Sequence, residues 1–358
     1  MIEKIDTPCD EGMNSLKTKV VSTPSYHRTF NPETGFTARW GVTHDDDPSY
    51  SPLGPEIADI EISVNGCPNA SKGDGKGGCN FCYKGNTDKA PFNMSLDKYK
   101  EVLDNIGSNL DQVALGLTGI YTNPNLIPIL QETRARGIIP NFTISGIDLD
   151  ETIAREVVKY VGAIAVSIYS SDKNVGYNAI RMLQDLGLRQ ANMHLLASME
   201  TLDFIYEVLE DIRNDIVSPN AVVFLAVKPK GRAKGHFTPM SQSSFNTLMQ
   251  YCLDNKIRFG MDSCSSIKFY RFLEGMSNDF SDKMKECVEP CESGLFSIYV
   301  NVHGKVFPCS FCEGVEEWKK GVDTKDMWFN SKIIGWRNYL VSNVENGCRK
   351  CPMFEGIN

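Results

Sequence analysis

Three cysteines stand close together in the stretch NGCPNASKGDGKGGCNFCYKGN, at positions 67, 79 and 82. The loop around them is rich in Gly, Lys and Asp, so we expect it at the surface rather than in the core. Three thiolates are one fewer than a closed tetrahedral zinc or iron site needs. A metal held by Cys67, Cys79 and Cys82 would keep one position open for a ligand from outside the protein, which is typical of a site that does chemistry.

A second group of cysteines follows about 200 residues later. Cys291 and Cys309 flank a predicted β-hairpin that turns at residues 303–304, and the segment GCRKC supplies Cys348 and Cys351. Four thiolates in this arrangement can close around one iron–sulfur cluster or one zinc ion. Because the twelve cysteines fall largely into such short groups, their spacing favours metal or redox chemistry over disulfides.

Composition limits the classes of protein that have to be considered. The chain has 358 residues, of which 41% are hydrophobic, so it can bury a large core and a smaller satellite domain. A net charge of −8 argues against a general nucleic-acid-binding surface. No apolar run approaches the ~18 residues of a membrane span, and MIEKIDTPCDEGMN lacks the apolar stretch of a signal peptide. We therefore expect a cytoplasmic protein with no membrane partner.

From residue 57 onward, strand-like apolar runs alternate with helical runs. The strand IADIEISVNG leads into the first cysteine loop, and a helix with Ser95 as its N-cap follows. Later strands are predicted at QVALGL, PNFTISG, AIAVSIY, ANMHLLAS, AVVFLAVKP and IRFGMDS. The six β/α units predict an α/β protein built on a partial (β/α)6 parallel barrel with its helices outside. A solenoid of about 33-residue repeats is the alternative, but no shared repeat sequence supports it.

Three domains follow from this organisation. Residues 1–56 form a polar N-terminal extension with a hairpin around NPETG, residues 57–270 form the partial barrel, and residues 271–358 form a small iron–sulfur domain. In a parallel barrel, the loops after the carboxyl ends of the strands surround the functional mouth. We therefore expect the thiols of the first loop, and the segments after each later strand, to converge on one cavity.

Both cysteine systems resemble a known family. The spacing CX11CX2C, with Phe81 directly before the last cysteine, resembles a widened form of the radical S-adenosylmethionine (SAM) signature, in which a CX3C loop is followed by C-X-aromatic-C. The pattern C-X12-G-X4-C, followed later by CX2C, resembles the auxiliary-cluster twitch domain, a short form of the SPASM domain. KDMWFNSKIIGWRNYL resembles the helix that such domains place before their last cysteines. A zinc loop with a fourth ligand elsewhere is the alternative for the first site.

The resemblance implies a specific chemistry and a set of cofactors. In radical SAM enzymes a [4Fe–4S] cluster, here on Cys67, Cys79 and Cys82, binds SAM and reduces it to methionine and a 5′-deoxyadenosyl radical, which abstracts hydrogen from the substrate. The twitch resemblance implies one auxiliary [4Fe–4S] cluster, here on Cys291, Cys309, Cys348 and Cys351. An electron donor such as flavodoxin or ferredoxin is implied as a partner.

The resemblance also places residues near SAM. Phe81 is expected to contact it. After the second barrel strand the family often carries GGEP, whose Glu holds the SAM amino group; LTGIYTNPNL lacks this Glu, so Thr118 and Gly119 are expected to substitute for it. Ser145 and Ser167 follow the next two strands. The alternative for each of these residues is an ordinary turn position.

Three further side chains near the mouth have open interpretations. Arg232, in the basic run KPKGR with Lys228 and Lys230, is a candidate for binding SAM or an anionic substrate, and a solvated basic face is the alternative. Cys264 ends the last barrel strand. It is a candidate catalytic residue, as a hydrogen donor to a substrate radical, or a substitute ligand of the auxiliary cluster, with ordinary packing as the alternative. His194 is interpreted as a core or rim histidine.

The resemblance leaves two substrate classes. The first is a peptide or protein residue modified by oxidation, crosslinking, epimerisation or methylthiolation, which would make the protein an oxidoreductase or a sulfur-transferring enzyme. We favour it because the 56-residue extension adds surface that a small alcohol would not need. The alternative is dehydrogenation of a small molecule such as an aminocyclitol or a sugar. A non-enzymatic electron carrier would not require a six-unit barrel with an open three-cysteine site.

Overall fold

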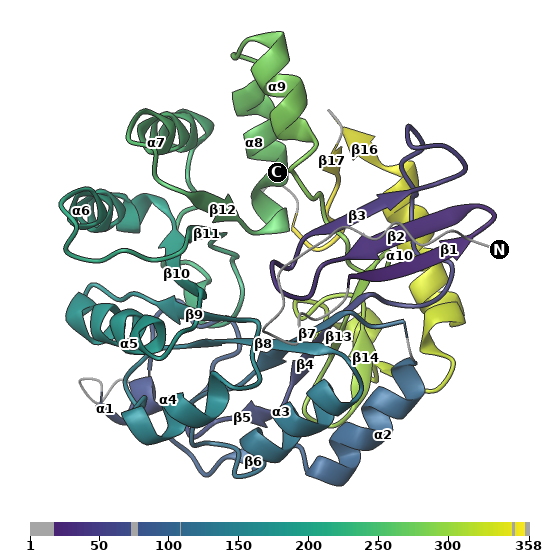
Figure 1. The fold of residues 1–358 in the computed structure, drawn as a ribbon, viewed down its shortest axis with the longest axis horizontal. Coiled ribbons are helices and arrows are strands. Elements are labelled where there is room, and N and C mark those ends of the chain that lie inside the picture. Colours follow the sequence, from purple (N-terminus) through teal and green to yellow (C-terminus); the bar gives the residue numbers. More distant parts are fainter. Residues whose placement is uncertain (1–17, 73–77, 108, 346–347, 355–358) are drawn as a thin grey trace, which may run out of the picture. The chain divides into compact units, whose positions relative to one another are not determined.

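The computed structural model describes residues 18–72, 78–107, 109–345 and 348–354 (Figure 1). The chain divides into two compact units, Met1–Pro48 and Ser49–Asn358. Cys9 and residues 73–77 of the first cysteine loop lie outside the described residues. In the part of the chain that is described, no helix has both the length and the apolar content needed to cross a membrane.

The first unit contains a three-stranded antiparallel sheet of β1 (Lys19–Thr23), β2 (Tyr26–Phe30) and β3 (Thr37–Trp40). The predicted hairpin around NPETG joins β2 to β3. Its turn forms because the Asn31 side-chain oxygen accepts hydrogen bonds from the backbone N–H groups of Glu33 (2.9 Å) and Thr34 (3.0 Å). The sequence analysis did not anticipate β1.

The second unit is built on a ten-stranded sheet with the order β12-β11-β10-β9-β8-β7-β4-β13-β14-β15. Neighbouring strands are parallel from β12 through to β13, and β14 and β15 continue the sheet antiparallel. The strands are β4 (Ile57–Glu61), β7 (Gln112–Gly116), β8 (Ile139–Ile144), β9 (Ala163–Ser167), β10 (Gln190–Ala197), β11 (Val222–Ala226), β12 (Phe259–Met261), β13 (Ser297–Val300), β14 (Lys305–Phe307) and β15 (Val322–Asp323). The fold is therefore α/β with a large, mostly parallel sheet.

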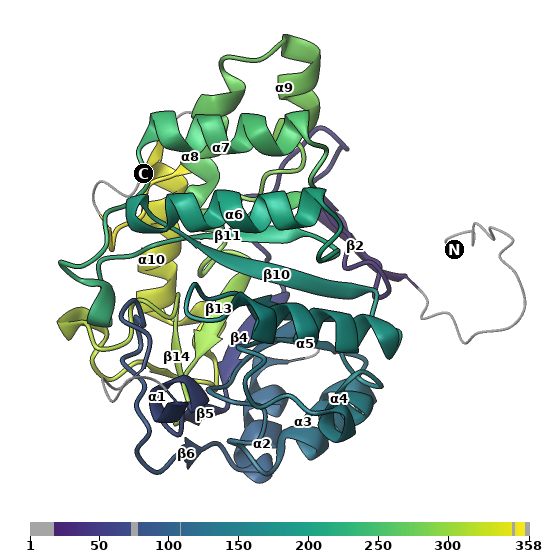
Figure 2. The same ribbon diagram turned by 90° about the vertical axis from the view of Figure 1, so that its left-hand side faces the viewer.

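The helices predicted between the strands are present and lie outside the sheet, where α5 and α6 pack against β10 (Figure 2). They are α2 (Leu96–Ile106), α3 (Leu126–Ala135), α4 (Glu151–Val157), α5 (Lys173–Asp185), α6 (Leu202–Arg213) and α7 (Gln242–Asp254). Helix α2 begins as predicted, because the Ser95 hydroxyl accepts a hydrogen bond from the backbone N–H of Lys98 (3.2 Å).

Side-chain alternation gives the sheet one apolar face and one functional face. On β4, Ala58 and Ile60 are fully buried, whereas Asp59 and Glu61 point to the opposite side. The same period of two holds along β10, where His194 lies between the buried Met193 and Leu195. Helices cover the apolar face, which leaves the other face free to build a cavity.

The C-terminal part joins the sheet instead of standing apart from it. The predicted hairpin is present: β13 and β14 are joined by a turn in which the Gly304 N–H donates to the Asn301 carbonyl (2.8 Å). Its first strand pairs in parallel with β4, with Ser297 beside Ile57, which the sequence analysis did not predict. The remaining elements are α1 (Pro68–Lys72), β5 (Ser63–Val64), β6 (Phe92–Asn93), α8 (Ser266–Leu273), α9 (Asn278–Lys285), α10 (Ser331–Ser342), β16 (Val344–Glu345) and β17 (Cys348–Arg349).

Candidate active site at the carboxyl edge of the sheet

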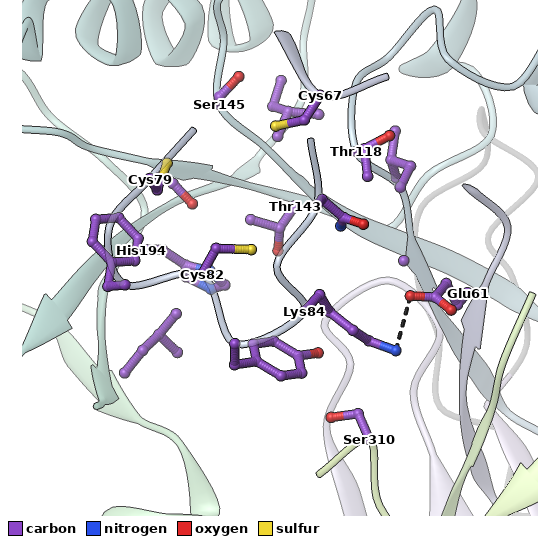
Figure 3. Close-up of a pocket in the computed structure, with 18 of the residues that line it drawn as sticks. Glu61, Cys67, Cys79, Cys82, Lys84, Thr118, Thr143, Ser145, His194 and Ser310 are labelled. Atoms are coloured by element: carbon purple, nitrogen blue, oxygen red, sulfur yellow. Dashed lines mark ion pairs between the residues drawn. The ribbon is translucent and has the colours of Figure 1, made fainter. Parts of the chain in front are cut away.

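A cavity of about 550 Å³ opens at the carboxyl ends of the parallel strands. Cys67, Cys79 and Cys82 line it together, and Figure 3 shows them around one space with side chains from the strand ends. The sequence-predicted residues on its wall are Phe81, Thr118, Gly119, Ser145 and Ser167. The volume lies within the ~300–1,000 Å³ range of small-molecule sites in proteins.

The two ends of the first cysteine loop are fastened to each other. The Asn65 side-chain oxygen accepts hydrogen bonds from the backbone N–H (3.2 Å) and the hydroxyl (3.1 Å) of Thr87, and the Asn86 side-chain oxygen accepts one from the Asn65 N–H (3.1 Å). The Cys67 N–H donates to the Thr87 carbonyl (3.0 Å). These bonds bring Cys67 close to the segment that carries Cys79 and Cys82, although more than ten residues separate them.

Arg232 reaches the same loop from the segment after β11. Its guanidinium donates to the carbonyl oxygen of Cys79 (2.8 Å) and to that of Asn86 (3.0 and 3.1 Å). A side chain at Gly231 would meet the Tyr83 carbonyl at 2.4 Å, so glycine permits this close approach. Arg232 does not line the cavity. The structure shows it half-buried and bound to backbone carbonyl oxygens of the loop, rather than on a solvated basic face.

The donor set in the loop suits an iron–sulfur cluster. Burial, and then the neighbouring thiols of Cys67 and Cys82, raise the pKa of Cys79 to about 11. Three thiolates crowded together are unfavourable unless a cationic centre lies between them. A cluster that keeps one iron open supplies such a centre and needs three protein thiolates. Among the described residues, no group of three or more His, Cys, Asp or Glu side chains is arranged to hold a metal ion as it stands.

An aromatic wall flanks the thiols. The ring of Phe81 stacks on Tyr169, with centroids 5.8 Å apart, and packs edge-to-face with Phe237, with centroids 5.9 Å apart. Burial raises the pKa of the Tyr169 hydroxyl well above its ordinary value, so this hydroxyl stays protonated beside Cys79. Tyr169 was not identified from the sequence.

Thr118, which was expected to replace the missing Glu, already forms hydrogen bonds within the protein. The Thr118 hydroxyl donates to the Asn65 carbonyl (2.6 Å), and its N–H donates to the Ser63 hydroxyl (3.1 Å), so Thr118 fastens the strand end to the start of the cysteine loop. Gly119 lines the cavity without a side chain, and a Cβ atom at this position would lie only 2.6 Å from an Asp148 carboxylate oxygen.

A charged network that the sequence analysis missed borders the cavity on the β4 side. The Lys84 ammonium lies 2.9 Å from a Glu61 carboxylate oxygen, and it also contacts Glu313 and the Tyr299 hydroxyl. A dashed line marks the Lys84–Glu61 ion pair in Figure 3. Asn301 donates to the other Glu313 oxygen (2.7 Å). Although burial acts to raise the pKa of Glu313, the hydrogen bond and charge of Lys84 hold it below its ordinary value.

A second pair lies across the cavity. Lys228 is buried and forms an ion pair with Asp262, whose other oxygen accepts from the Ser265 hydroxyl (2.8 Å). Burial acts to lower the pKa of Lys228, but the Asp262 carboxylate outweighs it and the pKa is raised. His194 lines the cavity, and burial lowers its pKa to about 4 against the charge of Asp262, so it is neutral at pH 7.

The C-terminal cysteines gather in one neighbourhood. Burial raises the pKa of Cys291 to about 11, and the charges of Cys309 and Cys351 act in the same direction. The pKa of Cys348 is also raised, by burial and by the charge of Cys291. Cys264 lies within electrostatic reach of Cys291 and Cys309, and it does not line the cavity. The structure therefore groups Cys264 with the predicted auxiliary ligands.

The remaining described cysteines differ in their burial. Cys312 is buried and hydrogen-bonded to Cys309, which makes it a further thiol of the C-terminal group. Cys252 is buried in α7, as expected for a core residue, and Cys287 is exposed. All the described cysteines are free thiols.

Comparison with solved structures places this fold among known proteins. SuiB from Streptococcus suis bound to the precursor peptide SuiA aligns with a TM-score of 0.63 and 11% identity, over 91% of this chain and 92% of that one. SuiB bound to S-adenosylmethionine aligns with a TM-score of 0.60 and 14% identity, over 81% and 69%. The protein anSMEcpe with bound AdoMet and the Cp18Cys peptide gives 0.56 and 14%, over 83% and 87%.

No protein-family model matches the sequence, and no curated protein matches it. The identities to the solved structures are low, so the likeness concerns the fold alone. This chain has the fold of proteins that are known in complex with S-adenosylmethionine and with peptides, as its resemblance to radical SAM enzymes implied.

Proposed function

We propose that this protein is a radical SAM enzyme that modifies a peptide. The observation that carries the proposal is the convergence of Cys67, Cys79 and Cys82 on a cavity at the carboxyl edge of a parallel sheet. It is supported by a fold shared with SuiB and anSMEcpe, each of which has been captured with SAM and with a peptide.

The three thiols would hold a [4Fe–4S] cluster with one iron left open. The chemistry that such a cluster supplies is one-electron reduction of bound SAM, giving methionine and a 5′-deoxyadenosyl radical that takes a hydrogen atom from the substrate. The protein orients SAM and keeps water out. The stacked rings of Phe81 and Tyr169 form the apolar side of the site, and the hydroxyls of Ser145 and Ser167 offer hydrogen bonds at the ends of two neighbouring strands.

Cys291, Cys309, Cys348 and Cys351 would hold an auxiliary [4Fe–4S] cluster in the C-terminal part. Because Cys264 and Cys312 lie in the same neighbourhood, thiols are plentiful enough for every iron to have a protein ligand. A fully ligated second cluster suits the removal of an electron from a substrate and leaves no iron free for sulfur delivery. We therefore place oxidation of a peptide residue ahead of methylthiolation, and we assign Cys264 to the spare thiols beside this cluster rather than to hydrogen donation.

The test compares the wild-type protein with the variant in which Cys67, Cys79 and Cys82 are all Ala, after anaerobic reconstitution with iron and sulfide. The wild type should release 5′-deoxyadenosine from SAM on reduction, and the triple variant should lose this activity while keeping about four irons per chain. Cys287→Ala, at an exposed thiol, is the matched control and should behave as wild type.

Undiminished 5′-deoxyadenosine from the triple variant would overturn the catalytic assignment. Purified protein that contains zinc and takes up no iron would overturn both cluster assignments. Loss of all iron in the triple variant would be compatible with the catalytic cluster and would overturn the auxiliary cluster.

A further inference from the structure

One carboxylate in the cavity has been left without a partner. Asp59 lies on β4 beside Ala114 of β7 and Tyr299 of β13, and its side chain lines the cavity. The residue is exposed, and it borders the cavity. Within the described part of the chain, its carboxyl group makes no hydrogen bond or ion pair, and burial raises its pKa to about 6.

The other acidic side chains on the cavity wall are neutralised. Glu61 is paired with Lys84, and Asp262 with Lys228. These two lysines are the cations that line the cavity in the described structure, and His194 is neutral at pH 7. The lining thus carries one carboxylate more than it has cations, and that carboxylate is Asp59.

Small residues keep space open next to this carboxylate. The neighbouring strand β7 presents Ala114 and Gly116 on the same face, and Gly116 is exposed to the cavity. A side chain at position 116 would come within 3.2 Å of the Glu61 backbone, so the strand stays bare there. An unbranched chain ending in a polar group can therefore pass along β7 toward Asp59.

We propose that Asp59 is the anchor of a subsite for a cationic group of the substrate, a protonated amine or a guanidinium. The inference deepens the proposed function, because the substrate must enter this cavity for the subsite to act. A carboxylate inside a cavity and without a counter-charge is costly, and a cation offsets that cost through both charge and hydrogen bonding. A neutral donor supplies only the hydrogen bond. For a peptide substrate, the complementary group is a basic side chain.

The test uses small probes, since the substrate is unidentified. Binding of n-butylammonium, n-butylguanidinium and the neutral n-butanol to reconstituted, SAM-loaded protein is measured by ligand-observed NMR at pH 7.5. The wild type should bind both cations about tenfold more tightly than butanol, as expected when a charge-assisted hydrogen bond replaces a neutral one. Asp59→Asn should remove this preference and leave butanol binding unchanged. Asp203→Asn, on the exposed face of α6, is the matched control.

Equal binding of charged and neutral probes to the wild type, or no binding of either, overturns the proposal without any variant. Cation preference that survives in Asp59→Asn overturns it as well. Because the assay does not require SAM cleavage, its outcome is separate from that of the proposed function. Protein that forms 5′-deoxyadenosine but shows no cation preference contradicts only the subsite, and the reverse pattern contradicts only the radical chemistry.

Discussion

At the scale of single residues, the cavity contains a carboxylate that folding alone does not favour. Asp59 faces Glu61 on its own strand, Tyr299 on β13, and Tyr83 from the cysteine loop, with Lys84 and Cys309 nearby. Lys84, the cation of this set, is already bound to Glu61 and Glu313. A residue kept in such a position at a cost in stability is typical of a functional site.

We predict that Asp59→Asn stabilises the folded protein, and that the gain depends on pH. Burial raises the pKa of folded Asp59 from 3.8 to about 6. Between these values the folded state holds a proton that the unfolded chain has released, so wild-type stability falls as pH rises through this window. Asn carries no charge at any pH. The difference in thermal midpoint between variant and wild type should be largest at pH 8 and smaller at pH 5.5, and a constant or opposite difference contradicts the assignment.

The sequence revealed the thiols but not the charged residues around them. Closely spaced cysteines are rare enough to indicate a metal site from sequence alone. Asp59 and Glu61 alternate with apolar residues in IADIEIS, and this pattern ordinarily marks the solvent face of a strand. Which residues face a cavity depends on the strands that pair on either side. The partner of Glu61, Lys84, is brought to it by a loop whose path leaves no local signal.

At the scale of elements, the cysteine loop is an unusually long connection whose two ends are held together. Asn65, Asn86 and Thr87 fasten its ends, and Arg232 bridges Cys79 and Asn86 from the segment after β11. The guanidinium can bond two carbonyls at once because its donors form a rigid fork, which a lysine ammonium cannot match. We therefore propose that Arg232 positions the thiols through these carbonyl groups.

We predict that Arg232→Met weakens iron binding at the catalytic loop. Hydrogen bonds from a charged donor contribute roughly 1.5–3 kcal/mol, so the loop arrangement proposed to bind the cluster should be about ten- to a hundredfold less populated. Iron content under limiting iron should fall toward the value of the triple cysteine variant, with Arg232→Lys in between. Arg213→Met, which removes an exposed pair with Glu210, is the control. Full iron uptake by Arg232→Met would show that the loop forms without this anchor.

The periodic elements were largely predictable, and the connections between distant ones were not. Apart from α1 and β6, which were not predicted, the strands and α-helices from β4 to β12 follow the predicted runs. Ser95 caps α2 because its hydroxyl can reach a free N–H. Helices α8 and α9 were missed, although IKFYRFL has an apolar face of helical spacing. The predicted boundary at residue 270 falls within α8.

At the scale of the whole second unit, one half-buried lysine connects segments from three parts of the sequence. Lys84 follows the cysteine loop, Glu61 ends β4, and Tyr299 and Glu313 belong to the C-terminal part. The side chain of Glu61 is only 6% exposed. The contacts of Lys84 therefore connect the candidate catalytic loop to the region that holds the second group of cysteines.

We predict that Lys84→Met destabilises the protein far more than the loss of a surface pair does. Removing one partner of a buried ion pair leaves an uncompensated charge and costs about 3–5 kcal/mol. The control, Lys159→Met, removes an exposed pair with Glu156 and should cost at most ~0.5 kcal/mol. Thermal midpoints of the two reconstituted variants, measured side by side against wild type, provide the check. Equal thermal midpoints for the two variants would mean that solvent compensates the charges of Glu61 and Glu313 once Lys84 is removed.

The pairing of β13 with β4 also bears on how the protein is made. About 240 residues separate Ile57 from Ser297, its partner across the two strands, and at ~5–20 residues per second a ribosome needs on the order of 10–50 s to synthesise that length. During this interval the outer edge of β4 has no strand beside it, and an open edge next to apolar residues invites pairing with other chains. The outer edge of β4 is therefore open to wrong pairing until β13, the last of the parallel strands to be synthesised, has emerged.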